Sequence, residues 1–386
     1  MLRLLHTADV HLGARHADLG EQATAQRERQ FDAFRASVDL AIAEQVDLVL
    51  IAGDLFDSNA QPRRSVDRVA AELRRLSEAR IRTVLIPGTH DVYDRASIYR
   101  SHDLVALAGA SGSDFVTLLT PDRRSVRLET LDLTVHAQVF ATKRAPHSPL
   151  AGLDVAEDPS TWQVGMIHGS IAIPTQTEHD EVVITTDEIA ASKLDYLALG
   201  HWHSSSRGKA GKTVYAYAGA PEPVALDQDR AGNVLLVTFD LHDRKRSVQV
   251  EERRVGRTTF EKVEIDAARI ASQPGLIDQL GARADENLVL DVRLMGVRPD
   301  ALDLREEEIE AALAGRFLKI RVRDRSVPPL SEGPLPPEDT ILGAFVRDVQ
   351  AGIAELEAAD NTDGAAEARD VLRLGRLLLA GEEVTL

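Results

Sequence analysis

The sequence predicts a mixed α/β protein in which two β-sheets lie face to face and are flanked by helices, followed by a small α+β module and two C-terminal helices. Three observations predict this class. Short apolar runs alternate with amphipathic stretches in the first third of the chain. After Pro121 strand-like runs follow one another with shorter connections. From Phe260 a second strand and helix pattern begins, and a proline-rich stretch separates it from two helical stretches at the end.

The first third has the β-α-β-α-β pattern of strands buried between helices. Its strands are the apolar runs, and its helices are longer stretches with apolar residues at helical spacing. The expected elements are a strand at Leu2 to His6, a helix at Thr24 to Glu44, a strand at Asp47 to Ile51, a helix at Arg63 to Ala79 and a strand at Ile81 to Ile86.

The rest of the first domain is predicted to be mainly β. Strands are expected at Leu131 to Phe140, Trp162 to Ile167, Tyr196 to Leu199, Val214 to Tyr217, Val234 to Asp240 and Val248 to Arg253. The smaller module should contain strands at Phe260 to Ile265, Leu288 to Met295 and Phe317 to Val322, with helices ending near Leu280 and spanning Leu304 to Ala314. The final helices are expected at Thr340 to Ala358 and Ala365 to Leu379.

These patterns divide the chain into four parts. We expect a first domain over residues 1–255, a small α+β domain over 256–325, a proline-rich linker over 326–337 and a helical segment over 338–386. The linker should be extended and semi-rigid because proline restricts its own backbone and that of the residue before it.

Composition limits the chemistry of the chain. The 386 residues include no cysteine, which excludes disulfides, zinc-thiolate sites and cysteine nucleophiles. His, Asp and Glu are therefore the side chains available for metal binding. The N-terminus runs directly into a strand, so we expect no signal peptide and no membrane span, and a cytoplasmic location. The net charge of −17 argues against a nucleic-acid partner, but basic and acidic residues balance over 1–100 and over 201–300.

Five short motifs follow predicted strands, where open α/β sheets place their ligand sites. Each motif alone is weak evidence, since an Asp-x-His triplet or a Gly-Asp pair is usually an ordinary turn or loop. Their joint occurrence in one order predicts a metal site. The motifs are Asp9-Val10-His11, Gly53-Asp54, Gly88-Thr89-His90-Asp91, His168-Gly169 and Gly200-His201-Trp202-His203.

Imidazole and carboxylate groups without thiolate suit Mn, Fe or Zn at paired sites. Two metals about 3.5 to 4 Å apart can hold the attacking and leaving oxygens of a phosphoryl transfer and acidify a bridging water. The motifs therefore predict hydrolysis of a phosphate ester without a covalent intermediate.

The order of the motifs resembles the calcineurin-like metallophosphoesterase superfamily. Within it, LLHTADVHLG, LVLIAGDLFDS and GHWHS are similar to the SbcD branch of DNA double-strand-break nucleases. The resemblance implies that residues 1–255 are the metallophosphoesterase catalytic domain and 256–325 a capping domain. It also implies that residues 338–386 dock on an SbcC-like ATPase of the SMC family.

The resemblance also implies a role for each motif residue. The first metal would be held by Asp9, His11, Asp54 and His203, and the second by Asp54, His168 and His201. His90 would stand beside the scissile phosphate as a non-ligand catalytic residue, with Asp91 behind it fixing its tautomer. A supporting role outside the ligand set is expected for Asp57.

One position departs from the family pattern. The family has asparagine where this chain has Thr89, and that asparagine supplies a carbonyl oxygen to the second metal. Thr89 offers a hydroxyl, which is a shorter and weaker neutral ligand. Either its hydroxyl or a water completes the coordination, or the second metal binds loosely.

The leading hypothesis is a DNA exonuclease and endonuclease with two divalent metals, Mn²⁺ being favoured. It would be a homodimer in complex with an SbcC-like SMC-family ATPase. One alternative keeps the metal site but acts on a small phosphodiester or phosphomonoester. A second alternative is a scaffold whose metal site is weakened at Thr89 and whose role is to hold a partner.

Overall fold

A computed structural model describes residues 1–113, 115–151, 153, 155, 158–175, 177, 180–225, 228, 230–243, 245–299, 302–327 and 336–379. The chain forms two compact units, Met1–Phe260 and Glu261–Leu386. No helix among the described residues is long and apolar enough to cross a membrane.

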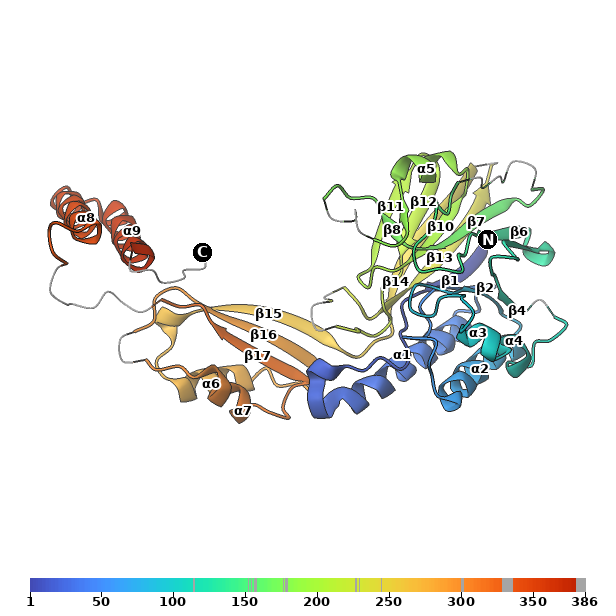
Figure 1. The fold of residues 1–386 in the computed structure, drawn as a ribbon, viewed down its shortest axis with the longest axis horizontal. Coiled ribbons are helices and arrows are strands. Elements are labelled where there is room, and N and C mark those ends of the chain that lie inside the picture. Colours follow the sequence, from blue (N-terminus) through green and yellow to red (C-terminus); the bar gives the residue numbers. More distant parts are fainter. Residues whose placement is uncertain are drawn as a thin grey trace. The chain divides into compact units, whose positions relative to one another are not determined.

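The first unit contains two six-stranded sheets (Figure 1). The first sheet has the order β14-β13-β1-β2-β3-β4, in which β1 to β4 are parallel and β13 and β14 are antiparallel to their neighbours. Its strands are β1 (Leu2–Thr7), β2 (Leu48–Ala52), β3 (Arg82–Ile86), β4 (Val116–Leu118), β13 (Asn233–His242) and β14 (Lys245–Arg254).

The second sheet has the order β11-β12-β10-β7-β6-β5, with β12, β10, β7 and β6 parallel. Its strands are β5 (Ser125–Leu128), β6 (Leu133–Ala137), β7 (Trp162–His168), β10 (Tyr196–Gly200), β11 (Ser206–Ala210) and β12 (Thr213–Tyr217). The short strands β8 (Ser170–Ile171) and β9 (Val183–Ile184) pair with each other.

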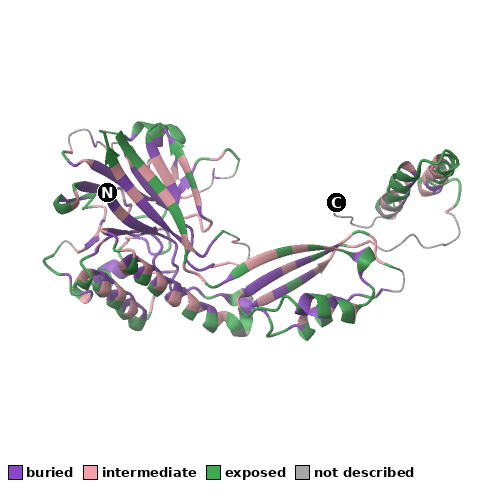
Figure 2. Ribbon diagram, turned by 180° about the vertical axis from the view of Figure 1, so that it is seen from behind, coloured by how far each residue is buried: buried purple, intermediate pink, exposed green. Residues whose placement is uncertain are grey.

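The two sheets pack face to face around a shared core. Leu48, Leu50 and Val84 of the first sheet lie in one apolar cluster with Val164 and Tyr196 of the second. The central strands are nearly continuous apolar runs because both of their faces are buried. Figure 2 shows this burial along the strands, in contrast to the exposed outer faces of the helices.

Helices cover the outer face of the first sheet. Alternate strand residues such as Leu5 and Val49 pack against Phe34 of α1 and Leu73 of α2, which bury one apolar side each. The short helix α5 begins with a capping box formed by Thr185 and Glu188. The helices of this unit are α1 (Ala23–Ala43), α2 (Arg63–Glu78), α3 (Ile98–Ser101), α4 (Leu104–Leu107) and α5 (Thr186–Ala191).

The second unit holds a three-stranded sheet and two helix pairs. The strands β15 (Thr259–Asp266), β16 (Leu288–Met295) and β17 (Lys319–Asp324) bury alternate residues against α6 (Gln273–Gly281) and α7 (Glu306–Ala312). Helices α8 (Ile341–Ala358) and α9 (Thr362–Leu379) pack against each other.

The predicted α/β class with two packed sheets is confirmed, and most predicted strands and helices occur within a few residues of their expected bounds. The strand expected at Leu131 to Phe140 is shorter, because Glu129–Leu131 forms a 3₁₀ turn before it. The sequence patterns missed β4, β5, β8, β9 and β11 and the short helices α3, α4 and α5. Much of the expected linker, residues 328–335, lies outside the described residues.

Candidate metal centre

The five motifs lie at the carboxyl ends of five strands. Strands β1, β2 and β3 are parallel neighbours that end at Thr7, Ala52 and Ile86, and the first three motifs follow them. Strands β7 and β10 are parallel neighbours of the second sheet and end at His168 and Gly200. The loops after these strands carry every predicted ligand.

The loops after β1 and β2 run side by side. The Asp9 amide donates to the Gly53 carbonyl at 3.1 Å, and the His11 amide donates to the Asp54 carbonyl at 3.0 Å. Asp9, His11 and Asp54 have φ values of 53°, 49° and 49°, and His201 has 107°. Left-handed backbone is costly for residues with a Cβ, and such strain gathers at functional sites. The surrounding bonds hold these residues where their side chains meet.

Two donor sets that share Asp9 meet in the cluster, and a third lies beside them. Asp9, His11 and His203 form the first set and Asp9, Asp54 and His168 the second, while His11, Asp57 and His90 form the third, with ligand atoms within 4.8 Å of one another in each. Oδ2 of Asp54 lies 3.6 Å from Nε2 of His11 and 3.1 Å from Nε2 of His168. Asp9 and Asp54 therefore stand between the histidines of the two sheets.

Close backbone approach joins the second sheet to the first. Nδ1 of His168 lies 3.0 Å from the Ala52 carbonyl, which can accept its proton and leave Nε2 facing Asp54. The His201 amide donates to Asp9 Oδ1 at 2.8 Å. A Cβ at Gly200 would lie 2.1 Å from the Ala52 carbonyl oxygen, so only glycine allows this approach.

Burial and mutual charge shift the ionisation of the carboxylates. Burial raises the pKa of Asp9 to about 6. Burial also acts to raise the pKa of Asp54, but the positive charges of His168 and His11 outweigh it and hold that pKa well below the usual value. For His168, burial acts to lower the pKa, and Asp54 outweighs it and raises the pKa to about 10.

The other two histidines are held neutral. Burial lowers the pKa of His201 to about 4 and that of His203 to about 3, with the charge of His168 and His11 respectively adding to the effect. Nε2 of His203 lies 3.1 Å from Nε2 of His11. His203 thus presents a neutral nitrogen, the form that binds a metal. For His11 burial acts to lower the pKa, but Asp57 and Asp54 outweigh it and raise the pKa, so this imidazole must lose a proton before it can ligate.

The donor groups fit divalent metals. Asp9 and Asp54 are almost completely buried, and each faces histidines rather than Lys or Arg. Within the described residues, Oδ2 of Asp9 and Nε2 of His168 make no hydrogen bond, and the approach of His168 to Asp54 is that of an ion pair. A buried polar atom without a partner is costly, and a coordinated cation would satisfy both of these atoms. Such an ion would be held by these residues.

His90 has a different partner from the one the sequence predicted. Its Nδ1 lies 3.0 Å from the Asp57 carbonyl and 3.7 Å from the Asp57 carboxylate. Its side chain is 47% exposed, whereas the other predicted site histidines, all described in the structure, are buried or half-buried.

Asp91 instead ties three neighbouring segments together. It is fully buried and accepts hydrogen bonds from the Gly88 amide at 2.7 Å, the Phe56 amide at 3.2 Å and the Tyr99 hydroxyl at 2.6 Å. The expectation that Asp91 orients His90 is therefore corrected. Asp91 has the geometry of a brace for the loop that carries His90, because both of its oxygens are used by other donors.

Thr89 lies beside the second predicted metal position. It is buried, and it lines one groove together with His168.

Trp202 is placed by packing, since its ring stacks on Tyr217 with centroids 4.9 Å apart.

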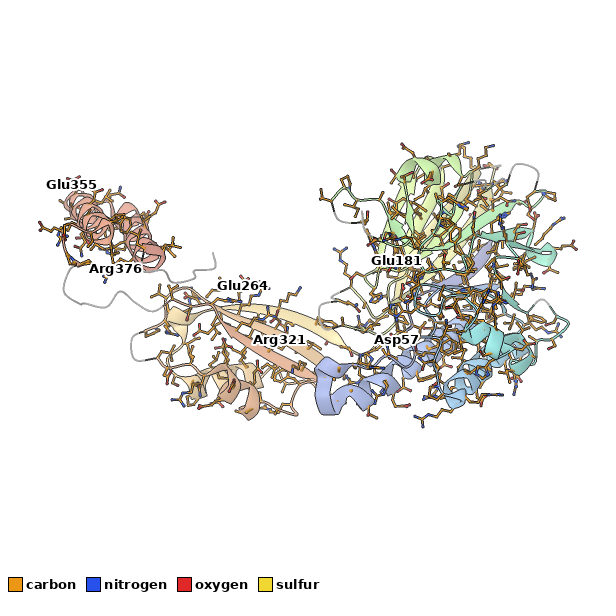
Figure 3. The ribbon with its side chains drawn as sticks, viewed as in Figure 1. Asp57, Glu181, Glu264, Arg321, Glu355 and Arg376 are labelled. Atoms are coloured by element: carbon orange, nitrogen blue, oxygen red, sulfur yellow. The ribbon has the colours of Figure 1, made fainter. Side chains whose placement is uncertain are left out.

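Two side chains outside the predicted ligand set contact histidines of the site, and sequence reasoning missed one of them, Gln228. Nε2 of Gln228 lies 2.5 Å from Nδ1 of His203, and Asp57 Oδ1 lies 3.2 Å from Nδ1 of His11. Asp57, labelled in Figure 3, was expected to have some supporting role because it lies in a motif. Gln228 follows no motif, and the sequence contains no signal that places it 25 residues away against His203.

Fold and site together define a metal-dependent phosphoesterase. The model of the family described as Calcineurin-like phosphoesterase matches residues 2–205, more than half of the chain. The chain belongs to that family.

Relatives named DNA double-strand break repair protein Mre11 are similar to this chain. The one from Aeropyrum pernix is 29% identical over 276 residues, which cover 69% of this chain and 64% of the relative. The one from Methanopyrus kandleri is 26% identical over 388 residues, covering 93% and 80%. This chain thus aligns with less than two thirds of the length of the Aeropyrum relative.

Among solved structures, a dimetal phosphatase from Danio rerio is 13% identical, with a TM-score of 0.42. That match covers 66% of this chain and 98% of the other.

Proposed function

We propose that this protein is a nuclease that hydrolyses phosphodiester bonds of DNA with two divalent metals, Mn²⁺ being favoured. The observation that carries the proposal is the position of Asp54, whose Oδ2 faces both His11 and His168 while the two donor sets share Asp9. A carboxylate so placed can bridge two ions. Bound there, such ions would supply an acidified water and stabilise charge on the phosphate oxygens.

DNA is favoured over a small ester for two reasons. Two relatives whose matches cover 93% and 96% of this chain carry the name DNA double-strand break repair protein Mre11. The chain also continues beyond the matched family region, from residue 206 to 386, with a second compact unit that a small substrate does not require.

The catalytic roles follow from contacts. His90 is exposed and its Nδ1 can donate to the Asp57 carbonyl, so Nε2 is the atom available to a substrate oxygen. We propose that His90 stabilises the transition state at the phosphate or protonates the leaving oxygen. Asp9, His11, Asp54, Thr89, His168, His201 and His203 are assigned as metal ligands, and Asp91 as support for the His90 loop.

The test incubates the purified protein with Mn²⁺ and end-labelled DNA, alongside a chromogenic phosphodiester. Metal-dependent cleavage of DNA, abolished by chelation, is the expected result. Cleavage of the chromogenic ester with intact DNA would favour the small-substrate alternative. Binding of metal without hydrolysis of either would favour the scaffold alternative.

We further propose that α8 and α9 dock on an SbcC-like SMC-family ATPase and that the nuclease acts as a homodimer. The helix pair exposes Ile341 at 79%, Val371 at 49% and Leu378 at 58% of their surfaces, although each is apolar. Ile341→Asp and Leu378→Asp in the full chain should weaken co-purification with the ATPase and leave hydrolysis of the chromogenic ester intact. Undiminished affinity would refute the docking assignment.

A further inference from the structure

Two grooves border the metal-ligating cluster in the first unit. One is lined by His201, Trp202 and His203 together with Gln228 and Arg230. The other is lined by Thr89 and His168 together with Lys143. Each groove thus joins predicted metal ligands to one cationic side chain.

Lys143 and Arg230 are exposed, and they lack a partner among the residues that the structure describes. Among the described residues, neither the Lys143 ammonium nor the Arg230 guanidinium makes an ion pair or hydrogen bond. By contrast, Arg63, Arg68 and Arg75 on α2 each pair with an acid. Within the described residues Lys212 is also exposed and unpaired, so what distinguishes Lys143 and Arg230 is that each lines a groove together with predicted metal ligands.

Hydrogen bonds hold the segments that carry Lys143 and Arg230. The Ala145 amide donates to the carbonyl of Glu181, labelled in Figure 3, at 2.8 Å, and Gln138 Nε2 lies 2.7 Å from His147 Nε2, so the loop bearing Lys143 is held at both ends. The Arg230 carbonyl accepts from the Ser205 amide at 3.4 Å, two residues from His203. Both cations are therefore presented by anchored segments.

We infer that Lys143 and Arg230 bind backbone phosphates of a nucleic-acid strand that crosses the metal centre from one groove to the other. The inference rests on the proposed function. It adds the residues that bind the strand on either side of the scissile bond. Phosphates are neutralised by Lys and Arg regardless of sequence, so this contact favours a polymer over a small ester without selecting bases. A chromogenic diester has a single phosphate, so it offers no neighbouring backbone phosphates for these cations to bind.

The test compares Lys143→Ala, Arg230→Ala, the double variant and Lys212→Ala with the wild type. Lys212 is an exposed cation in the turn between β11 and β12 that lines neither groove, so it controls for the change in net charge. The readouts are kcat/KM on an oligonucleotide at several salt concentrations and kcat/KM on the chromogenic diester in the same buffers.

Each groove variant should raise KM for the oligonucleotide several-fold and leave the chromogenic reaction unchanged. The slope of log kcat/KM against log salt should fall by about 0.7 to 0.9 for each phosphate contact removed, and about twice that in the double variant. Lys143→Arg should restore the slope, while Lys212→Ala should match the wild type.

The outcomes separate this inference from the proposed function. A wild type that cleaves DNA, with a double variant of unchanged slope, overturns the inference alone. Equal loss on DNA and on the chromogenic diester also overturns it, because the variants would then act through the metal ligands. A wild type that cleaves only the chromogenic diester overturns the proposed function as well.

Discussion

Asp57 Oδ1 lies 3.2 Å from Nδ1 of His11, on the side of the ring opposite to the nitrogen that faces Asp54. A carboxylate in this place fixes the ring orientation and the tautomer and makes the ligating nitrogen more basic. The carbonyl of the same residue lies 3.0 Å from Nδ1 of His90. One residue therefore orients two histidines for which we propose different roles.

Asp57→Ala should weaken metal binding and slow turnover together. Loss of a carboxylate behind a ligating histidine costs about 10 to 100-fold in metal affinity. Calorimetric titration with Mn²⁺ measures the affinity, and saturating Mn²⁺ in the activity assay isolates the effect on His90. Asp67→Ala, which removes an exposed acid of α2, is the control. Unchanged metal affinity in Asp57→Ala would show that the contact with His11 has no role.

His90→Ala should bind metal as tightly as the wild type and lose turnover by about 10² to 10⁴-fold, the range for removal of a general acid or base. The exposed ring of His90 lies outside the two donor sets that contain Asp9, although it forms a third set with His11 and Asp57, so bound metal has to be measured directly. Metal content after gel filtration and kcat on the chromogenic diester give the two readouts. A parallel loss of bound metal would make His90 a ligand.

Asp54→Ala should empty both metal positions. Its Oδ2 faces histidines of both sheets, so its loss should remove a ligand from both ions even though Asp9 also belongs to both donor sets. Elemental analysis should find less than one Mn²⁺ per chain, compared with two in the wild type. Retention of one ion at wild-type affinity would show that Asp54 does not bridge.

Thr89→Asn should tighten the second metal. The asparagine carbonyl reaches one bond further than the threonine hydroxyl, and a better placed ligand is worth about 1 kcal/mol or more, or several-fold in affinity. Mn²⁺ titration by calorimetry and by DNA cleavage provides the measurement. A fall in activity at unchanged affinity would instead mean that asparagine displaces His90 in this buried loop.

Metal binding should release protons. The pKa of His168 is raised to about 10 by Asp54, so below pH 10 the metal-free imidazole carries a proton that must leave before Nε2 can ligate. Burial raises the pKa of Asp9 to about 6, so a second proton leaves below pH 6. Affinity should rise at least tenfold per pH unit from 6 to 9, because the raised pKa of His11 adds to that of His168, and more steeply below 6. Titrations in buffers of different ionisation enthalpy count the protons, and identical heats would contradict the assignment.

The ligand types and their strands could be predicted from sequence because each motif follows an apolar run. Asp9 and Asp54 follow strands that pair in parallel, so their loops had to share one edge of the sheet. His201 and His203 could be assigned for the same reason. The partner of His90 could not be predicted in this way, because Asp57 and Asp91 both lie in loops that carry the motifs. Only packing decides which carboxylate is occupied elsewhere.

The sequence by itself determined the fold class, the five strand ends and the chemistry of the donors, since apolar periodicity and residue type are local properties. Tertiary structure decided which donors share an ion site, because the second sheet is placed against the first by a core of residues distant in sequence. It also decided that Gln228 faces His203, that Asp91 bonds to three segments around the His90 loop, and that Lys143 and Arg230 line grooves together with predicted metal ligands. These are contacts between segments whose separation along the chain carries no information about their distance in space.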